Sequence, residues 1–87
     1  MATKERPIED RLREIIVDAL IVDETEVTLH SNLREDLGAD SLDLAEIGLR
    51  IEETFGFEVD DEDGDKLKTF EDCIKLVEKR VKAMGVQ

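Results

Sequence analysis

Three separate stretches of this chain repeat apolar residues at intervals of three and four positions, and this spacing constrains the fold more than any other feature. It places the apolar side chains on one face of an α-helix, whereas a half-buried strand alternates with a period of two. The stretches cover about residues 7–21, 41–55 and 70–84. Strand signals are scarce in the rest of the chain. We therefore predict an all-α, monomeric bundle with three main helices.

The ends of these helices carry recognisable signals. Pro7 suits the first position of a helix, where its missing N–H is not needed. Gly56 tolerates the left-handed backbone that often ends a helix, and Thr69 with Asp72 has the pattern of a capping box. The predicted core-facing residues are Ile8, Leu12, Ile15, Ile16 and Ala19 in the first helix, Leu44, Gly48, Ile51 and Phe55 in the second, and Phe70, Cys73, Ile74, Val77 and Val81 in the last.

The connection between the first two helices, residues 22–40, is longer than most loops of a compact domain. We expect four apolar residues to pin it onto the bundle: Val27, Leu29, Leu33 and Leu37. A single helical turn is predicted at residues 32–36, with Ser31 or Asn32 as its cap. His30 is a lone loop histidine, and we expect it to be solvated rather than to act as a pH switch.

Residues 60–65 form an acidic run around Gly64, which raises the question of a calcium-binding loop. The EF-hand pattern needs oxygen ligands at its first, third and fifth positions, glycine at the sixth and glutamate at the twelfth. When Gly64 is placed at the sixth position, Val59 falls at the first and Phe70 at the last. Neither side chain can bind calcium, so we expect no metal site.

The stretch at residues 37–43 reads Leu-Gly-Ala-Asp-Ser-Leu-Asp and leads from this connection into the second helix. Gly38 can adopt backbone angles closed to other residues, so the chain can turn sharply there. Asp40 is a good N-cap, and Asp43 lies three residues further on, where the helix dipole favours an acid. Ser41 is therefore expected at the start of the helix with an accessible hydroxyl.

A serine in this position allows three interpretations. It is, in the simplest case, an ordinary helix-start serine. A hydrolase nucleophile would need a base and an oxyanion hole, but the flanks lack the glycine-serine-glycine elbow and the neighbouring acids oppose a developing oxyanion. We therefore expect no catalytic residue. The third interpretation is a serine that another enzyme modifies, which needs only exposure and a recognisable helix.

The run from Asp36 to Asp43 closely resembles the acyl carrier proteins of bacterial fatty-acid synthesis. The resemblance extends from about Ile8 to Val81 and includes Glu46, Glu52, Glu53, Phe55 and residues 69–72. It implies that a phosphopantetheinyl transferase attaches 4'-phosphopantetheine to Ser41, and that the thiol of this arm holds acyl groups as thioesters. It also implies that the protein is a carrier and not an enzyme.

The same resemblance implies a short third helix near residues 60–65, anchored by Val59 and Leu67. It further implies that acyl-transfer and chain-elongation enzymes with basic patches dock on the second helix. The residues expected on this docking face are Asp40, Leu42, Asp43, Glu46, Leu49, Arg50 and Glu53. Arg50 is the odd cation among them, and Glu46 is expected to neutralise it in part from one turn earlier.

Composition is consistent with this function. The chain has 24 acidic residues against 12 Lys and Arg, and the net charge of −12 argues against binding to nucleic acid or to anionic membranes and favours basic partners. Its 87 residues suit one domain, 1–87, whose ends at about 1–6 and 84–87 we expect to be frayed. Cys73 is the single cysteine, and no signal peptide or membrane span is recognisable, so we expect a cytoplasmic protein.

Four positions depart from the pattern of the central fatty-acid carriers: Gly48, Arg50, Asp60 and Gly64. Each glycine is expected to weaken its helix by about 1 kcal/mol, and together they predict loose packing near Val59, Leu67 and Cys73. Three functions therefore stay open. The protein serves fatty-acid synthesis, or it serves a secondary pathway that makes a polyketide or a surface glycolipid such as lipopolysaccharide, or it is an unmodified acidic adaptor. The sequence does not give the acyl group.

Overall fold

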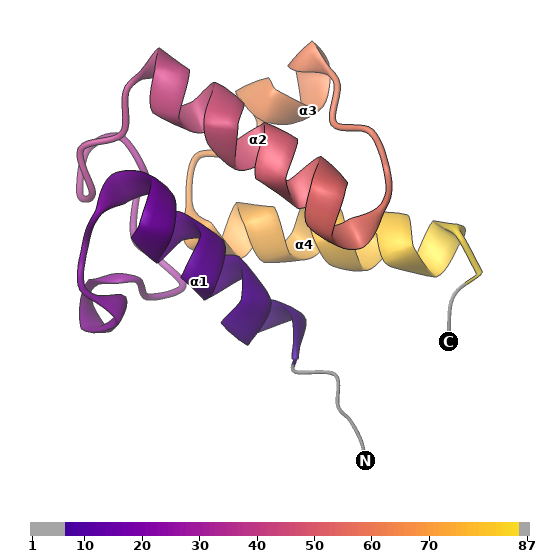
Figure 1. Cartoon of the computed structure of the whole chain (residues 1–87), viewed down its shortest axis with the longest axis horizontal. Coiled ribbons are helices and arrows are strands. Elements are labelled where there is room, and N and C mark those ends of the chain that lie inside the picture. Colours follow the sequence, from indigo (N-terminus) through magenta and orange to yellow (C-terminus); the bar gives the residue numbers. More distant parts are fainter. Residues whose placement is uncertain (1–6, 86–87) are drawn as a thin grey trace.

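The computed structural model describes residues 7–85 and contains four α-helices in that range (Figure 1). They are α1 (Ile8–Leu20), α2 (Ser41–Phe55), α3 (Asp61–Asp65) and α4 (Phe70–Ala83), and a short 3-10 helix, η1 (Glu24–Glu26), follows α1. No strand forms in this part of the chain, where only an isolated bridge pairs Asn32 with Thr69. The predicted all-α bundle of three main helices and one short helix is confirmed. The expected fraying of 1–6 and of 86–87 lies outside the described residues.

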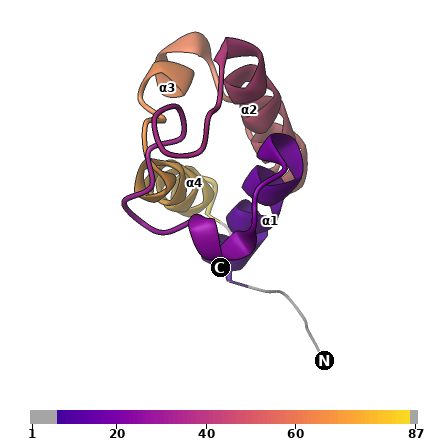
Figure 2. The same cartoon turned by 90° about the vertical axis from the view of Figure 1, so that its left-hand side faces the viewer.

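The three long helices surround a common core, and α3 lies beside α2 and above α4 (Figure 2). Helices α1 and α2 run in opposite directions (Figure 1). Arg11, early in α1, donates to the Thr54 carbonyl near the end of α2, whereas Asp18, late in α1, pairs with Arg50 further back along α2. The fully buried side chains come from all three long helices and from the connection: Leu12, Ile16, Val27, Leu33, Ile47, Ile51, Phe70, Cys73 and Val77.

Helix α1 is one residue shorter at each end than the spacing predicts. Pro7 is its N-cap rather than its first helical residue. At the other end Ile21 adopts a left-handed conformation with φ of 54°, which is rare for a β-branched residue, and its side chain is exposed. The remaining predicted caps are confirmed: Gly56 ends α2 with φ of 82°, and Thr69 forms a full capping box with Asp72.

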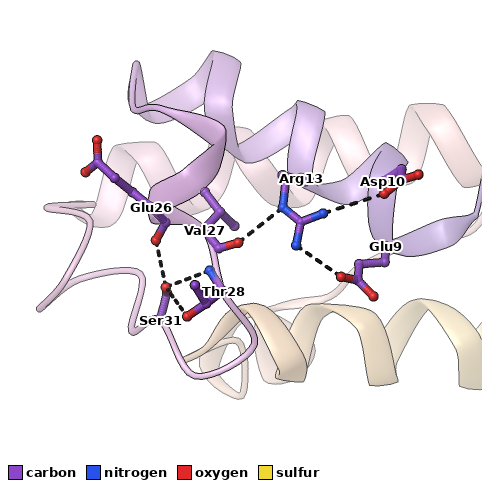
Figure 3. Close-up of polar contacts among 7 residues, drawn as sticks. All are labelled: Glu9, Asp10, Arg13, Glu26, Val27, Thr28 and Ser31. Carbon is purple, nitrogen blue, oxygen red and sulfur yellow. Dashed lines mark hydrogen bonds and ion pairs between the residues drawn. The ribbon is translucent and has the colours of Figure 1, made fainter.

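The connection at 21–40 is held by polar contacts as well as by apolar ones (Figure 3). The Arg13 guanidinium donates to the Val27 carbonyl at 3.1 Å and also contacts Glu9 and Asp10. Ser31 is buried and donates to the Glu26 carbonyl at 2.9 Å, so it does not cap the next turn. The connection is therefore bound to α1 at Val27 and is held internally by the bond between Ser31 and Glu26.

The turn at residues 32–36 forms as predicted, and Asn32 is its cap. The side-chain oxygen of Asn32 accepts from the amides of Arg34 and Glu35 at 3.0 and 2.9 Å. Of the four apolar residues expected to pin the connection, three are buried. Leu29 is the exception, with 41% of its surface exposed. Its contact with the bundle is made by the backbone instead, since the Leu29 carbonyl accepts from the Glu71 amide at the start of α4.

The core face of α2 also differs from the prediction. Gly48 and Ile51 are buried as expected, but the third buried residue is Ile47, which the prediction did not include. Leu44 and Phe55 are only half-buried and pack against the edge of the core. The face of α2 that meets α1 and α4 is thus centred on Ile47 and Ile51, and Leu44 lies towards the side on which α3 is found.

Candidate functional site

Ser41 is the first residue of α2, and the local backbone presents its hydroxyl outward. Gly38 has a φ of 78°, and the chain turns there before it enters the helix. Asp40 then caps α2: its Oδ1 accepts from the Asp43 amide at 2.8 Å, and Asp43 Oδ2 accepts from the Asp40 amide at 3.1 Å. Because the two aspartates cap the helix between them, the exposed Ser41 side chain has no capping function to perform.

One side chain does approach the serine. Arg34, in the capped turn at residues 32–36, donates from Nη2 to Ser41 Oγ at 3.3 Å. A guanidinium has five donors and does not accept a proton near neutral pH, so it cannot serve as a general base for this hydroxyl. The surroundings of Ser41 in the described part of the chain therefore suit a hydroxyl that is acted upon rather than one that attacks on its own.

A pocket of about 660 Å³ opens beside Ser41, between α2 and α3. Its wall includes Leu44 and Gly48 from α2, Val59 and Leu67 from the segments that flank α3, and Gly64 from α3 itself. The pocket lies where loose packing was predicted, beside Val59 and Leu67, and the looseness of the packing stays a prediction. Cys73 is fully buried elsewhere in the core and does not line this pocket, so that part of the prediction was wrong.

The two glycines shape this pocket in different ways. A Cβ built on Gly48 would meet Val59 Cγ1 at 3.7 Å, which is ordinary van der Waals contact, whereas a Cβ on Gly64 would meet nothing within 4 Å. Gly48 thus leaves the inner wall of the pocket unfilled. Gly64 leaves space on the side of α3, the shortest of the four α-helices.

The chain matches the protein family described as "Phosphopantetheine attachment site" over residues 10–77. The chain belongs to this family. Its members carry covalently attached 4'-phosphopantetheine and are carriers without catalytic activity of their own, which confirms the resemblance to acyl carrier proteins. Carrier domains of this kind interact with transferases and with acyl-handling enzymes. Within the described residues, none of the helices has the length and apolar character needed to cross a membrane.

The carrier's predicted docking residues lie along α2 and at its start. Leu42 and Leu49 expose 81% and 55% of their surface, so both offer apolar contact area to a partner. Asp40, Glu46 and Glu53 are exposed, and Asp43 is half-buried by its role in the cap. Their use in docking stays a prediction.

Arg50 is neutralised from two sides. Its Nε lies 3.5 Å from Glu46 Oε2, as the spacing of one turn predicts, and its Nη1 lies 3.6 Å from Asp18 Oδ2 of α1. The second contact was not predicted, because no sequence pattern links residues 18 and 50. Arg50 therefore joins α1 to α2 instead of standing as a free cation on the docking face.

Cys73 is the carrier's own thiol and lies fully buried on α4. Burial, and to a lesser degree the charge of Asp72, raise the pKa of this thiol to about 12. Since the thiolate is the reactive form, the side chain is inert in the folded protein. This confirms its prediction as a small buried apolar residue.

Two features near the site were not predicted from the sequence. Asp60, noted only as a departure from the family, is the N-cap of α3 and forms a capping box with Asp63; the bond from the Asp63 amide lowers the pKa of the Asp60 carboxyl. Arg34 was not singled out either. Its proximity to Ser41 follows from the capped turn at 32–36, which was predicted from the sequence. That turn is therefore the sequence feature from which Arg34 could have been identified.

Proposed function

We propose that Ser41 is the residue to which the phosphopantetheine arm is attached. The observation that carries this proposal is an exposed hydroxyl at the start of α2 whose capping function has been taken over by Asp40 and Asp43, next to a 660 Å³ pocket. The residues around it fit the arm, because a guanidinium lies beside the hydroxyl that would bear a phosphodiester.

Attachment follows from the chemistry of the donor, coenzyme A. The Ser41 hydroxyl oxygen forms a bond to the phosphorus that bears pantetheine, the bond from that phosphorus to the bridging oxygen breaks, and 3',5'-ADP leaves. A base on the transferase takes the hydroxyl proton, since this chain offers no base to Ser41 among its described contacts. When bound, the arm supplies a thiol that holds acyl groups as thioesters, and partner enzymes perform the reactions.

We further propose that the α2–α3 pocket shelters the acyl chain and that the carrier serves fatty-acid or related lipid synthesis in the cytoplasm. The apolar wall formed by Leu44, Val59 and Leu67 supports this proposal, because it offers a hydrocarbon chain apolar contact. The exposed Leu42 and Leu49, with the acids of α2, are the proposed contacts for basic partner enzymes, which would be steered to Ser41 by charge.

A second candidate function rests on the glycines. Gly48 and Gly64 remove side chains from two walls of the same pocket, which favours a branched, hydroxylated or otherwise bulky acyl group. That cargo would place the carrier in a secondary pathway, such as one that makes a surface glycolipid or a polyketide. An unmodified adaptor has no observation in its favour.

The attachment site is tested by incubating the protein with a phosphopantetheinyl transferase and coenzyme A and measuring its intact mass. The wild type should gain the mass of one arm, and peptide fragmentation should place it on Ser41. Ser41→Ala should gain nothing yet keep the helical circular dichroism of the wild type, because Asp40 still caps α2. The matched control, Thr25→Ala, removes an exposed hydroxyl of η1 and should be modified normally. Modification of the Ser41→Ala variant would overturn the proposal.

A further inference from the structure

Arg34 stands apart from the other arginines in the described part of the chain. Arg11 and Arg13 each contact a backbone carbonyl and an aromatic ring, Arg50 pairs with two carboxylates, and Arg80 contacts a carboxylate, a carbonyl and a ring. Each of these arginines is thus matched to an anion or to an electron-rich group. Among residues 7–85, the Arg34 guanidinium contacts only a neutral hydroxyl, that of Ser41.

This arrangement is unexpected in a protein with a net charge of −12. Two carboxylates directly follow Arg34 in the sequence, at Glu35 and Asp36. Asp36 nevertheless accepts from the backbone amide of Asn32 at 2.8 Å, and no carboxylate of the described residues pairs with Arg34. The capped turn fixes the backbone of Arg34, because the backbone amide of Arg34 donates to Asn32 Oδ1 at 3.0 Å. The guanidinium is therefore placed beside Ser41 by a rigid turn and carries an unneutralised charge.

We infer that Arg34 is the positioning residue for the phosphodiester of the arm, an inference that rests on the proposed attachment at Ser41. Attachment converts the Ser41 Oγ into an ester oxygen and adds one negative charge to the phosphate group bonded to it. Without a cation, this charge would meet the carboxylates of Asp40 and Asp43, which cap the same helix end. Arg34 is already within 3.3 Å of that ester oxygen, so its donors can reach the phosphate oxygens with little movement.

The position of Arg34 also gives the arm a direction. Arg34 and Ser41 both line the pocket between α2 and α3, so a phosphate held by Arg34 lies on the pocket side of the serine. The pocket side is also where the acyl chain would have to enter. Arg34 thus favours the state in which the arm lies against the carrier, and a partner enzyme must compete with this one contact to withdraw it.

The inference is tested with four full-length proteins, each prepared without and with the arm: the wild type, Arg34→Gln, Arg34→Lys and Lys79→Gln. Lys79 is exposed on the later part of α4, whose end lies away from the start of α2 (Figure 1), so Lys79→Gln changes the net charge equally at a remote place. The Arg34 side chain is exposed, so its replacement should not prevent folding. Intact mass first establishes that each protein is fully modified.

Two measurements are then compared. Attachment should lower the midpoint of thermal unfolding in Arg34→Gln by about 2–4 °C relative to its effect in the wild type, which is the shift expected for one exposed charge pair in a chain of this size. Arg34→Lys should recover part of the difference, Lys79→Gln should behave as the wild type, and the difference should fade in about 1 M salt. In the wild type, the Arg34 Nε–H resonance should move on attachment while those of the other described arginines stay in place.

The outcomes distinguish the proposed attachment at Ser41 from the proposed role of Arg34. A wild type that gains no arm overturns the proposed attachment and this inference together. Full modification followed by an unmoved Arg34 resonance, or by equal thermal shifts in Arg34→Gln and Lys79→Gln, overturns the role of Arg34 alone and leaves the attachment site intact.

Discussion

The two sides of this small bundle are built differently. On the α1–α4 side, meaning helices α1 and α4 with the connection at 21–40, the contacts are between fully buried residues such as Leu12, Phe70 and Val77. On the α2–α3 side, meaning the outer face of α2, the loop at 57–60 and α3, helix α3 has no buried residue and a pocket remains open. One side has the packing of a protein core, and the other does not.

Polar contacts hold α3 where apolar packing is missing. Arg80 of α4 pairs with Asp63 and donates to the Glu58 carbonyl at 2.8 Å, while its guanidinium lies 5.6 Å from the centre of the Phe57 ring. The Val59 amide donates to Glu52 Oε2 at 2.7 Å. Hydrogen bonds and ion pairs of this kind contribute modestly and exchange with water. We therefore expect α3 to open without loss of the core, as the proposed uptake and release of an acyl chain would require.

The largest expected effect comes from a matched pair of valine truncations, one on each side. Val77→Ala removes two methyl groups from a fully buried position of α4 and should lower the free energy of unfolding by about 2–3 kcal/mol. Val59→Ala, at a half-buried position in the wall of the pocket, should cost about 1 kcal/mol or less. Denaturant unfolding followed by circular dichroism measures both. Equal losses would show that the two sides are packed alike.

The buried thiol gives a pH dependence that belongs to the α1–α4 side. The pKa of Cys73 is raised to about 12 by burial and the Asp72 charge, from an ordinary value near 9.0. The unfolded chain therefore loses the proton first, and the stabilising contribution of the neutral thiol is complete below pH 9 and declines as the pH rises towards 12. The loss should reach about 1.4 kcal/mol at pH 10.

Unfolding of the wild type and of Cys73→Ala, measured at pH 8 and pH 10, isolates this contribution from that of the lysines. Between pH 8 and pH 10 the free energy of unfolding should fall by about 1.4 kcal/mol less in Cys73→Ala than in the wild type. The same burial predicts that native protein without the arm resists thiol reagents, whereas protein with the arm reacts once. Rapid labelling of Cys73 in the folded protein would show that this thiol is neither buried nor inert.

The smallest effect concerns Arg50, which links the two sides through Asp18 of α1 and Glu46 of α2. Arg50→Ala should change the free energy of unfolding by about 0–1 kcal/mol, because both pairs are partly exposed. It should also release the carboxylates of Glu46 on the docking face and of Asp18 on α1, and so raise the rate of modification by a basic transferase at low salt but not at high salt. Unchanged rates at every salt concentration would remove Arg50 as an element of partner choice.

Much of this fold could be predicted because its signals are local. Apolar spacing located the three long helices, and the pairs Asp40 with Asp43 and Thr69 with Asp72 located two of their starts. The same capping pattern occurs at Asp23 and Glu26, where η1 forms although no helix was predicted there. Ile47 was missed because α2 is apolar over a wide arc, and spacing alone does not say which part of that arc faces α1 and α4.

The candidate site likewise has features that follow from local sequence and features that depend on how the helices pack. The exposure of Ser41 follows from its immediate neighbours in sequence, and the prediction identified it. Two ion pairs of the helices around the site join residues that are distant in sequence: Arg50 with Asp18, and Arg80 with Asp63. Such pairs depend on how helices pack, and no spacing rule reveals them. Leu29 was wrongly expected to be buried, since its contact with the bundle is made by a backbone bond to Glu71 instead.

Uptake of cargo by the α2–α3 side is tested most directly by hydrogen exchange. Amides at residues 58–68 should exchange faster than those of α1 and α4 in unloaded protein, and an octanoyl chain on the arm should slow exchange at 58–68 while leaving α1 and α4 unchanged. In Gly48→Val, whose new side chain would stand against Val59, this slowing should be reduced. Equal protection of residues 58–68 in loaded and unloaded wild type would contradict uptake of cargo by the α2–α3 side. Slowing of exchange that is as large in Gly48→Val as in the wild type would contradict it as well.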